Sequence, residues 1–241
     1  MKITIKDVDI NYIEYGKGKD VILLHGWGQN ISMMKPIGDP LSKNNHIIIM
    51  DLPGFGESNE PKIAWNLNDY EEMLHEFIKK LKLKDVVLIG HSFGGRISAM
   101  YAADHNVSKL ILLSSPLIKK KKSESFKNKV LKFLKKIIKS KKLEEFMKQK
   151  LGSTDYKNAS PIMREVLVSA VNVDLLDYAN RITAPTLFIT GDSDKMVPYW
   201  EYKKIEETIK DCGLIVYEDR SHYAYLEELD RTVCIIEEFI K

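Results

Sequence analysis

The sequence predicts an α/β fold, in which helices cover both faces of a mostly parallel sheet. Fully apolar runs such as 21–24 and 110–113 recur along the chain, as expected for strands that are buried on both faces. These runs alternate with amphipathic segments at helical spacing, for example at 70–81. Parallel strands joined by helices produce this rhythm. A chain of 241 residues has room for one such domain with an insertion.

The expected elements follow the chain in order. Residues 1–15 alternate and predict two short strands, with Ile3/Ile5 and Ile10/Tyr12 on one face and a turn at 16–20. Either Asn68 or Asp69 is expected to cap the first long helix. Buried strands are expected at 21–24, 47–50, 86–89, 110–113, 186–191 and 214–217, and helices at about 68–81, 93–103, 199–210 and 229–240.

The rhythm stops at Pro116 and resumes at Thr186, which predicts a helical insertion at 117–183 within a core formed by 1–116 and 184–241. The insertion is rich in lysine: 119–150 holds fourteen lysines and three glutamates, although the whole chain has a net charge of only +3. Its apolar residues fall at helical spacing. The lysines are either a solvated face or a docking surface for an acidic partner.

Other partners and compartments are less favoured by the sequence. No nucleic-acid-binding motif appears among the lysines, so nucleic acid is not expected, and the apolar side of the helices is expected to face the rest of the protein rather than a membrane. The start of the chain has charges and no apolar signal segment. Cys212 and Cys234 lack metal-binding or redox spacing. We therefore expect a cytoplasmic protein with reduced thiols, no metal and no organic cofactor.

Residues 90–94 fit the motif G-x-S-x-G, which places Ser92 on a tight turn between the strand at 86–89 and the next helix. Any Cβ at Gly90 or Gly94 would collide within such a turn. The N-terminal N–H groups of the helix would lie beside the Ser92 hydroxyl and stabilise a developing oxyanion. The motif is short, and an ordinary strand–turn–helix with a chance serine also fits it.

A serine nucleophile needs a base, and the base needs an orienting carboxylate. His222 follows the last strand, whereas His105 ends the helix after Ser92 and is the weaker candidate. The loop after 186–191 contains Asp192 and Asp194 and reaches the same edge of a parallel sheet as His222. We choose Asp194 as the acid; Asp192 is the alternative, with a side chain suited to tightening the turn.

Five motifs in this order resemble the α/β-hydrolase superfamily. They are 24–28 (LHGWG), 51–58 (DLPGFGES), 90–95 (GHSFGG), 185–191 (PTLFITG) with Asp194 and Pro198, and Ser221-His222 with Glu227. The resemblance implies an α/β-hydrolase fold with an eight-stranded sheet and a helical cap, or lid, inserted after the sixth strand, which is where 117–183 lies. It also implies an oxyanion hole formed by the backbone N–H groups of Trp27 and Phe93. The family usually has glycine where this chain has Ser221.

The chemistry expected from this set is ester hydrolysis through an acyl-enzyme, with Ser92, His222 and Asp194 as the triad. The resemblance argues against dehalogenases and epoxide hydrolases, which have aspartate at the nucleophile position. A carboxylesterase for a small or medium acyl substrate is therefore expected. Candidates to line its acyl pocket, each equally compatible with ordinary packing, are Trp27, Phe93, Met163, Met196 and Tyr223.

Two alternatives remain open at this point. Residues 25–28 and 51–56 look similar to those of the pimeloyl-acyl-carrier-protein methyl ester esterases, and a lysine-rich cap would suit an acidic carrier protein. The second alternative is a non-catalytic or single-turnover ligand receptor that kept the hydrolase fold.

Overall fold

A computed structural model gives the fold, and it describes residues 1–119 and 154–241. Its centre is an eight-stranded sheet with the strand order β1-β2-β4-β3-β5-β6-β7-β8. The strands are β1 (Lys2–Ile5), β2 (Val8–Gly16), β3 (Lys19–Leu24), β4 (Asn45–Met50), β5 (Val87–His91), β6 (Lys109–Leu113), β7 (Thr186–Gly191) and β8 (Cys212–Tyr217). β2 is antiparallel to both β1 and β4, and the strands from β4 to β8 are parallel. The predicted mostly parallel sheet is confirmed.

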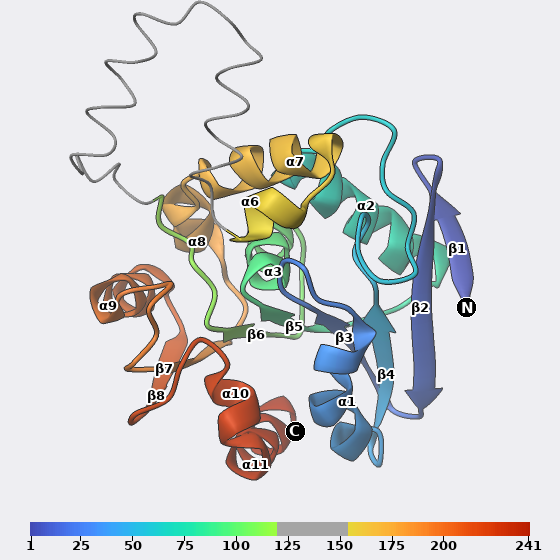
Figure 1. The fold of residues 1–241 in the computed structure, drawn as a ribbon. Coiled ribbons are helices and arrows are strands. Elements are labelled where there is room, and N and C mark those ends of the chain that lie inside the picture. The colour runs from blue at the N-terminus through green and yellow to red at the C-terminus, as the bar shows by residue number, and fades with distance from the viewer. Residues whose placement is uncertain (120–153) are drawn as a thin grey trace, which may run out of the picture.

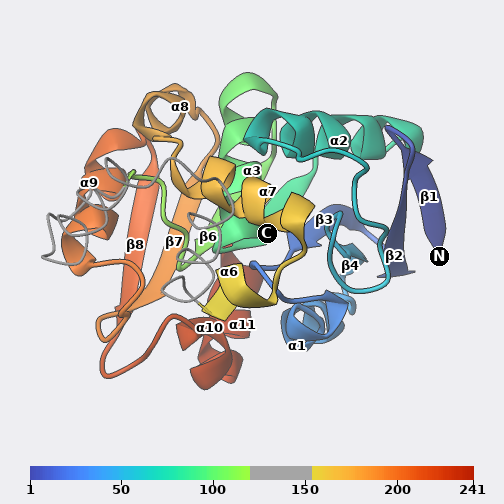
Figure 2. The same ribbon diagram turned by 45° about the horizontal axis from the view of Figure 1, so that its top comes forward.

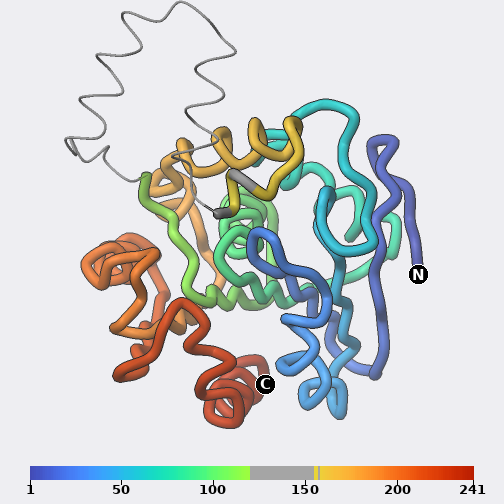
Figure 3. The backbone as a smooth tube through the Cα atoms, viewed as in Figure 1, coloured from blue at the N-terminus to red at the C-terminus, as the bar shows by residue number. Residues whose placement is uncertain are grey.

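Helices cover both faces of this sheet (Figure 1). They are α1 (Lys35–Leu41), α2 (Leu67–Lys80), α3 (Phe93–Asp104), α6 (Thr154–Asn158), α7 (Pro161–Val171), α8 (Leu176–Arg181), α9 (Tyr199–Thr208), α10 (Ala224–Glu227) and α11 (Leu229–Ile240), with a 3-10 turn at Ile31–Met33. α1, α10 and α11 pack on one face, and α2, α3, α8 and α9 pack on the other. The chain can be followed in Figure 3 from its N-terminus beside β1 to its C-terminus after α11.

The apolar core consists of two clusters, one on each face of the sheet. In β5, Val87 and Ile89 belong to one cluster and Leu88 to the other, and none of the three is exposed to solvent. Successive side chains of a strand point to opposite faces, so a strand covered on both sides has to be apolar throughout. This explains why the continuous apolar runs in the sequence mark the central strands.

Several boundaries differ from the sequence predictions. Helix α2 begins earlier than expected: Asn66 is the N-cap, and Asp69 completes a capping box with it by accepting the Asn66 backbone N–H at 2.9 Å. The predicted caps Asn68 and Asp69 were therefore wrong by one turn. The turn at 16–20 is also shorter, because β2 continues to Gly16 and β3 begins at Lys19.

The insertion, defined as residues 117–183, lies between β6 and β7 in the chain. Its described part contains α6, α7 and α8, and in Figure 2 helices α6 and α7 lie in front of the central strands. The lysine-rich stretch falls outside the described residues except for Lys119. Within 1–119 and 154–241, no helix has both the length and the apolar character needed to cross a membrane.

Candidate active site

Ser92 lies in the sharp turn between β5 and α3, with φ 48° and ψ −105°. Its backbone N–H donates to the Leu113 carbonyl at 2.9 Å, which ties the turn to the neighbouring strand β6. A Cβ on Gly90 would lie 2.5 Å from the Gly95 Cα, and one on Gly94 would lie 2.4 Å from the Leu24 carbonyl oxygen. Only glycine fits at both positions, so the spacing of the motif follows from the packing of α3 against β3 and β5.

The loops that follow β7 and β8 bring Asp194 and His222 together. His222 Nδ1 lies 2.8 Å from Asp194 Oδ2. Because a carboxylate only accepts hydrogen bonds, Nδ1 is the protonated nitrogen of the neutral ring, and Nε2 carries the lone pair. Asp192, the alternative acid, is exposed and has no bond to His222 in the described chain.

Asp194 is held as an ionised carboxylate by four donors. Oδ1 accepts the backbone N–H groups of Met196 and Val197 at 2.6 and 3.0 Å, and Oδ2 accepts the Tyr202 hydroxyl at 2.6 Å in addition to His222. Burial alone raises the pKa of Asp194, but the hydrogen bonds from His222 and Tyr202 outweigh burial and hold the pKa below its ordinary value. Asp194 is therefore charged at neutral pH and fixes the orientation of the imidazole.

Tyr202→Phe tests this arrangement through stability. Removing the hydroxyl from the charged carboxylate is expected to lower the free energy of unfolding by about 1.5–3 kcal/mol at pH 7. A lowered Asp194 pKa stabilises the fold above the ordinary value of 3.8, and this contribution is lost as the pH falls through the folded-state pKa. The loss in free energy of unfolding caused by Tyr202→Phe should accordingly be complete at pH 7 and should become smaller below about pH 4. Urea unfolding at several pH values measures it.

The matched control for this measurement is Tyr199→Phe. Tyr199 lies on the same helix, α9, but is 47% exposed and does not contact Asp194. Its substitution should leave the urea midpoint unchanged at every pH. A Tyr202→Phe deficit that stayed constant into acid would show that the hydroxyl contributes through packing and not through the Asp194 carboxylate.

Gly191 lets the two loops approach each other. A Cβ at this position would lie 2.0 Å from the Arg220 carbonyl oxygen and 2.8 Å from that of Ser221, directly before His222. Gly191→Ala is thus expected to destabilise the fold by about 1–3 kcal/mol, because rigid backbone must move. Chemical denaturation would measure this loss of stability. Gly213→Ala in β8 is the control, since a Cβ at Gly213 would meet only the Leu187 side chain, at 3.8 Å. Equal effects of the two substitutions would contradict this account.

Ser92 and His222 line one cavity of about 650 Å³. Among the described residues, the Ser92 hydroxyl makes no hydrogen bond to His222, although both side chains line this cavity. Trp27 and Phe93, the predicted oxyanion donors, also line the cavity. Their backbone N–H groups have no backbone acceptor in the described parts of the chain.

The predicted acyl-pocket residues divide into two groups. Trp27, Phe93, Met196 and Tyr223 line the cavity, with the Trp27 and Phe93 rings 5.4 Å apart in an edge-to-face contact. Met163 does not line it: the side chain is 3% exposed and packs over Gly54 in the core. Met163 lies on a face of α7 that packs on the loop after β4.

The model of the family described as the alpha/beta hydrolase fold matches residues 20–141, which is half of the chain. The chain belongs to this family. Asp194 and His222 lie beyond the matched region, so their assignment rests on the geometry above.

This α/β-hydrolase is similar to other proteins over almost its whole length. The AB hydrolase superfamily protein YisY of Bacillus subtilis (strain 168) is 29% identical, with 94% of this chain and 93% of the relative covered. The pimeloyl-acyl-carrier-protein methyl ester esterase of Legionella pneumophila (strain Corby) is 25% identical over 97% and 100%. The solved structure of the esterase EaEST from Exiguobacterium antarcticum is 25% identical, with a TM-score of 0.79 and coverage of 99% and 98%.

The sequence reasoning missed several side chains around the hydrolase site. His91 is buried, and burial lowers its pKa to about 3, so its ring is neutral. His91 Nε2 lies 3.2 Å from the His222 carbonyl oxygen, and Arg96 lines the cavity one helical turn after Ser92. For His91 and Arg96, the sequence offered one signal: each is a polar residue within an otherwise apolar strand, turn and helix. For Tyr202, only the tertiary packing of α9 brings the hydroxyl to Asp194.

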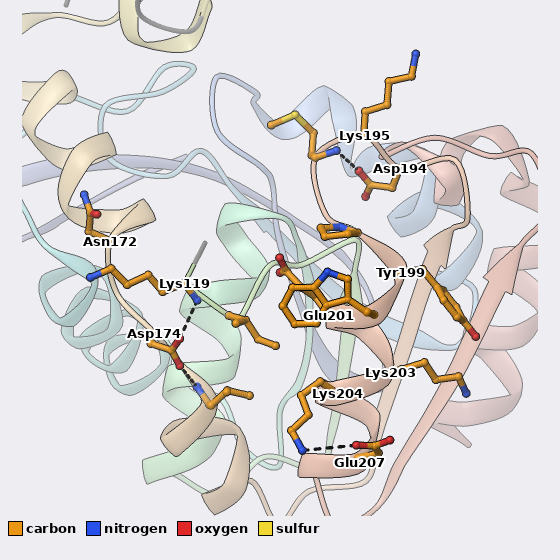
Figure 4. A pocket seen from close by; sticks show the side chains of 15 residues that line it. Lys119, Asn172, Asp174, Asp194, Lys195, Tyr199, Glu201, Lys203, Lys204 and Glu207 are labelled. Atoms are coloured by element: carbon orange, nitrogen blue, oxygen red, sulfur yellow. Dashed lines mark hydrogen bonds and ion pairs between the residues drawn. The ribbon is translucent and has the colours of Figure 1, made fainter. Parts of the chain in front are cut away.

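A wider groove lies outside the cavity (Figure 4). It separates α9 from residues 116–119 and 170–175, which we call the neck of the insertion. Lys119 and Asp174 line it on one side, and Tyr199, Lys203 and Glu207 on the other. In the described ranges, no group of three or more histidine, cysteine, aspartate or glutamate side chains is arranged to hold a metal ion.

Proposed function

We propose that the protein is a serine hydrolase that cleaves a carboxylic ester of a small or medium acyl group through an acyl-enzyme. One observation carries this proposal: His222, bonded to Asp194 at 2.8 Å, lines the same cavity as a serine held at φ 48°. A buried carboxylate that fixes the imidazole tautomer beside a strained serine is the arrangement that serine hydrolysis needs. The esterase names of several relatives support the same reaction class.

The reaction would proceed in two halves. His222 Nε2 takes the proton of Ser92 Oγ as this oxygen attacks the carbonyl carbon, and the backbone N–H groups of Trp27 and Phe93 bind the oxyanion. The tetrahedral intermediate collapses, the bond to the alcohol oxygen breaks, and His222 returns the proton to the leaving alcohol. Water then attacks the acyl-enzyme with His222 again as base, which releases the acid and regenerates Ser92.

The insertion would act as a helical cap over this site. Leu167, Ala170 and Val171 of α7 line the cavity together with Ser92. An acyl group bound to Ser92 would therefore extend against α7, and residues 117–183 would set its length and shape. This assigns the chemistry to 1–116 and 184–241 and substrate selection to the insertion.

A second candidate is a methyl ester carried on an acidic acyl-carrier protein. The relatives named pimeloyl-acyl-carrier-protein methyl ester esterase cover almost the whole chain, and residues 119–150 hold fourteen lysines against three glutamates. A basic surface would attract an acidic carrier and raise its rate of association. This candidate predicts a rate that falls steeply with ionic strength, which a free ester would not show.

The test is hydrolysis of p-nitrophenyl esters of increasing acyl length, together with fluorophosphonate labelling of Ser92. Turnover that peaks at one acyl length supports an esterase and measures its pocket. Labelling without turnover of any free ester would favour a carrier-bound ester, to be assayed directly, or a single-turnover receptor. Absence of both labelling and turnover would overturn the proposal.

A further inference from the structure

Arg96 is a buried cation in the first turns of α3, four residues after Ser92, and is only 5% exposed. In the described parts of the chain it forms no ion pair with a carboxylate; its guanidinium is bonded to backbone carbonyls. Nη1 donates to the Pro116 oxygen, and Nη2 donates to those of Ala170 and Val173 at 3.0 and 2.7 Å. One side chain thus bonds three backbone carbonyls.

These carbonyls belong to two segments: the start of the insertion and, within it, the C-terminal end of α7. Pro116 directly precedes the insertion, while Ala170 is in the last turn of α7 and Val173 follows that helix. The carbonyl end of a helix carries partial negative charge, so a cation is favourable there. Arg96 therefore bonds α3, the helix that follows Ser92, both to the chain entering the insertion and to the C-terminal end of α7.

The neck of the insertion is also bonded to itself. The Leu175 N–H donates to the Leu117 carbonyl at 2.8 Å, and the Lys119 N–H donates to Asp174 Oδ2 at 2.9 Å (Figure 4). Residues 117–119 and 174–175 are consequently bonded to each other and form one unit. Because Arg96 attaches this unit to α3, a change at Arg96 would move the whole neck relative to Ser92.

A packing role alone does not account for an arginine at this position. Burying a cation costs several kcal/mol unless hydrogen bonds compensate, and an apolar side chain could fill the same volume. Burial lowers the pKa of Arg96 to about 10, which still leaves the group charged at neutral pH. A planar guanidinium presents its donors from separate nitrogens in a rigid fork, whereas a lysine ammonium offers all its donors from one nitrogen.

We propose that Arg96 is a positioning residue that fixes the insertion over Ser92 and thereby determines which acyl groups the cavity accepts. Arg96, Ala170 and Asn172 all line the cavity that contains Ser92, so a shift of the α7 C-terminus changes its wall. The selectivity part of this inference rests on the proposed ester hydrolysis. The attachment itself does not.

The first test measures the attachment without any catalysis. Hydrogen exchange of the Leu175 amide, which is bonded to Leu117, is compared in the wild type, Arg96→Lys and Arg96→Gln. Each variant loses at least one bond from a charged donor to a carbonyl, so exchange should accelerate by about tenfold or more. Arg96→Lys keeps the charge and is the milder variant. Unchanged exchange in both variants would overturn the proposal.

Arg181→Gln is the matched control. Arg181 also joins the insertion to α3, through Asp104 at 2.8 Å, but its side chain is 46% exposed and does not line the cavity. An exposed pair of this kind contributes little. Exchange at Leu175 should stay within about twofold of the wild type in this variant. Equal acceleration in Arg181→Gln would show general loosening rather than a specific role of Arg96.

The second test measures kcat and KM for short and long p-nitrophenyl esters, per active site titrated with fluorophosphonate. In the Arg96 variants KM for the ester of the preferred acyl length should rise about tenfold, while kcat for the acetyl ester should stay within about threefold of the wild type. The difference in kcat/KM between the preferred and the short ester should therefore become smaller. Arg96 Nε is buried without a partner. If only esters bearing a second, anionic group lost activity, Nε would be a substrate contact and the positioning role would be wrong. If no form hydrolysed esters, the proposed function would fail, and exchange at Leu175 would still decide the attachment.

Discussion

Ser92→Ala is expected to lower kcat for the preferred ester by about 10⁴–10⁶-fold, the largest effect of any single substitution in this chain. Without the hydroxyl no acyl-enzyme forms, and only the oxyanion donors and substrate binding continue to accelerate hydrolysis by water. The fold should be retained, since Ala differs by one atom and the strained turn is held by the Ser92 backbone N–H and by the glycines at 90 and 94. Steady-state kinetics with mass-spectrometric detection of the acyl-enzyme measure the result.

Ser98→Ala provides the control on the same helix. Ser98 is fully buried, and its hydroxyl donates to the Gly94 carbonyl at 2.9 Å, but it does not line the cavity. Its loss should cost about 1 kcal/mol of stability with little change in kcat. Retention of more than about a hundredth of the wild-type kcat in Ser92→Ala would remove Ser92 from the role of nucleophile.

Asp194→Asn is expected to lower kcat by about 10⁴-fold at neutral pH. The carboxylate accepts the Nδ1–H of His222, which leaves Nε2 free to take the serine proton. An asparagine can present its NH₂ group to Nδ1 instead, which stabilises the tautomer protonated at Nε2, and that tautomer cannot act as a base. Binding of the ester should change little, so kcat and kcat/KM should fall together.

Asp192→Asn separates the two acids that the sequence left open. Asp192 is exposed on the same loop, and its backbone N–H donates to the Tyr217 carbonyl at 3.1 Å, an interaction that the substitution keeps. Its kcat should remain within about twofold of the wild type, as is usual for surface changes. A large loss in Asp192→Asn together with a small loss in Asp194→Asn would reverse the assignment of the acid.

Much of the fold could be predicted because the parallel strands are covered on both faces. This burial forces runs such as Ile47–Met50 to be wholly apolar, and such runs are visible without any tertiary information. Helix α1 was not predicted, since its seven residues include Pro36, Gly38 and Pro40, which usually end helices. Its formation depends on Ile37 and Leu41 packing onto the sheet, and only the tertiary structure provides that contact.

The candidate site shows the same division. Ser92, Asp194 and His222 could be proposed because they follow the ends of β5, β7 and β8, which lie at one edge of a parallel sheet, a rule of topology alone. Arg96 and Tyr202 act through contacts between elements distant in sequence, to Val173 and to Asp194 respectively. Met163 was assigned to the pocket from its presence in the insertion, but periodicity does not specify which face of a helix meets the cavity and which meets the core.

The bond between Leu117 and Leu175 has a consequence for how this protein can change over evolution. The chain leaves the core at Leu117 and comes back beside this residue at Leu175, whose backbone nitrogen lies 2.8 Å from the Leu117 oxygen, so the residues between them form a closed excursion. The entropic cost of closing a loop grows only slowly with its length. Segments of different length and composition can therefore be exchanged at this position with little effect on the sheet or on the strand ends that carry Ser92, Asp194 and His222. New substrate preferences can arise there by replacing a module, while the chemistry beneath it is inherited unchanged.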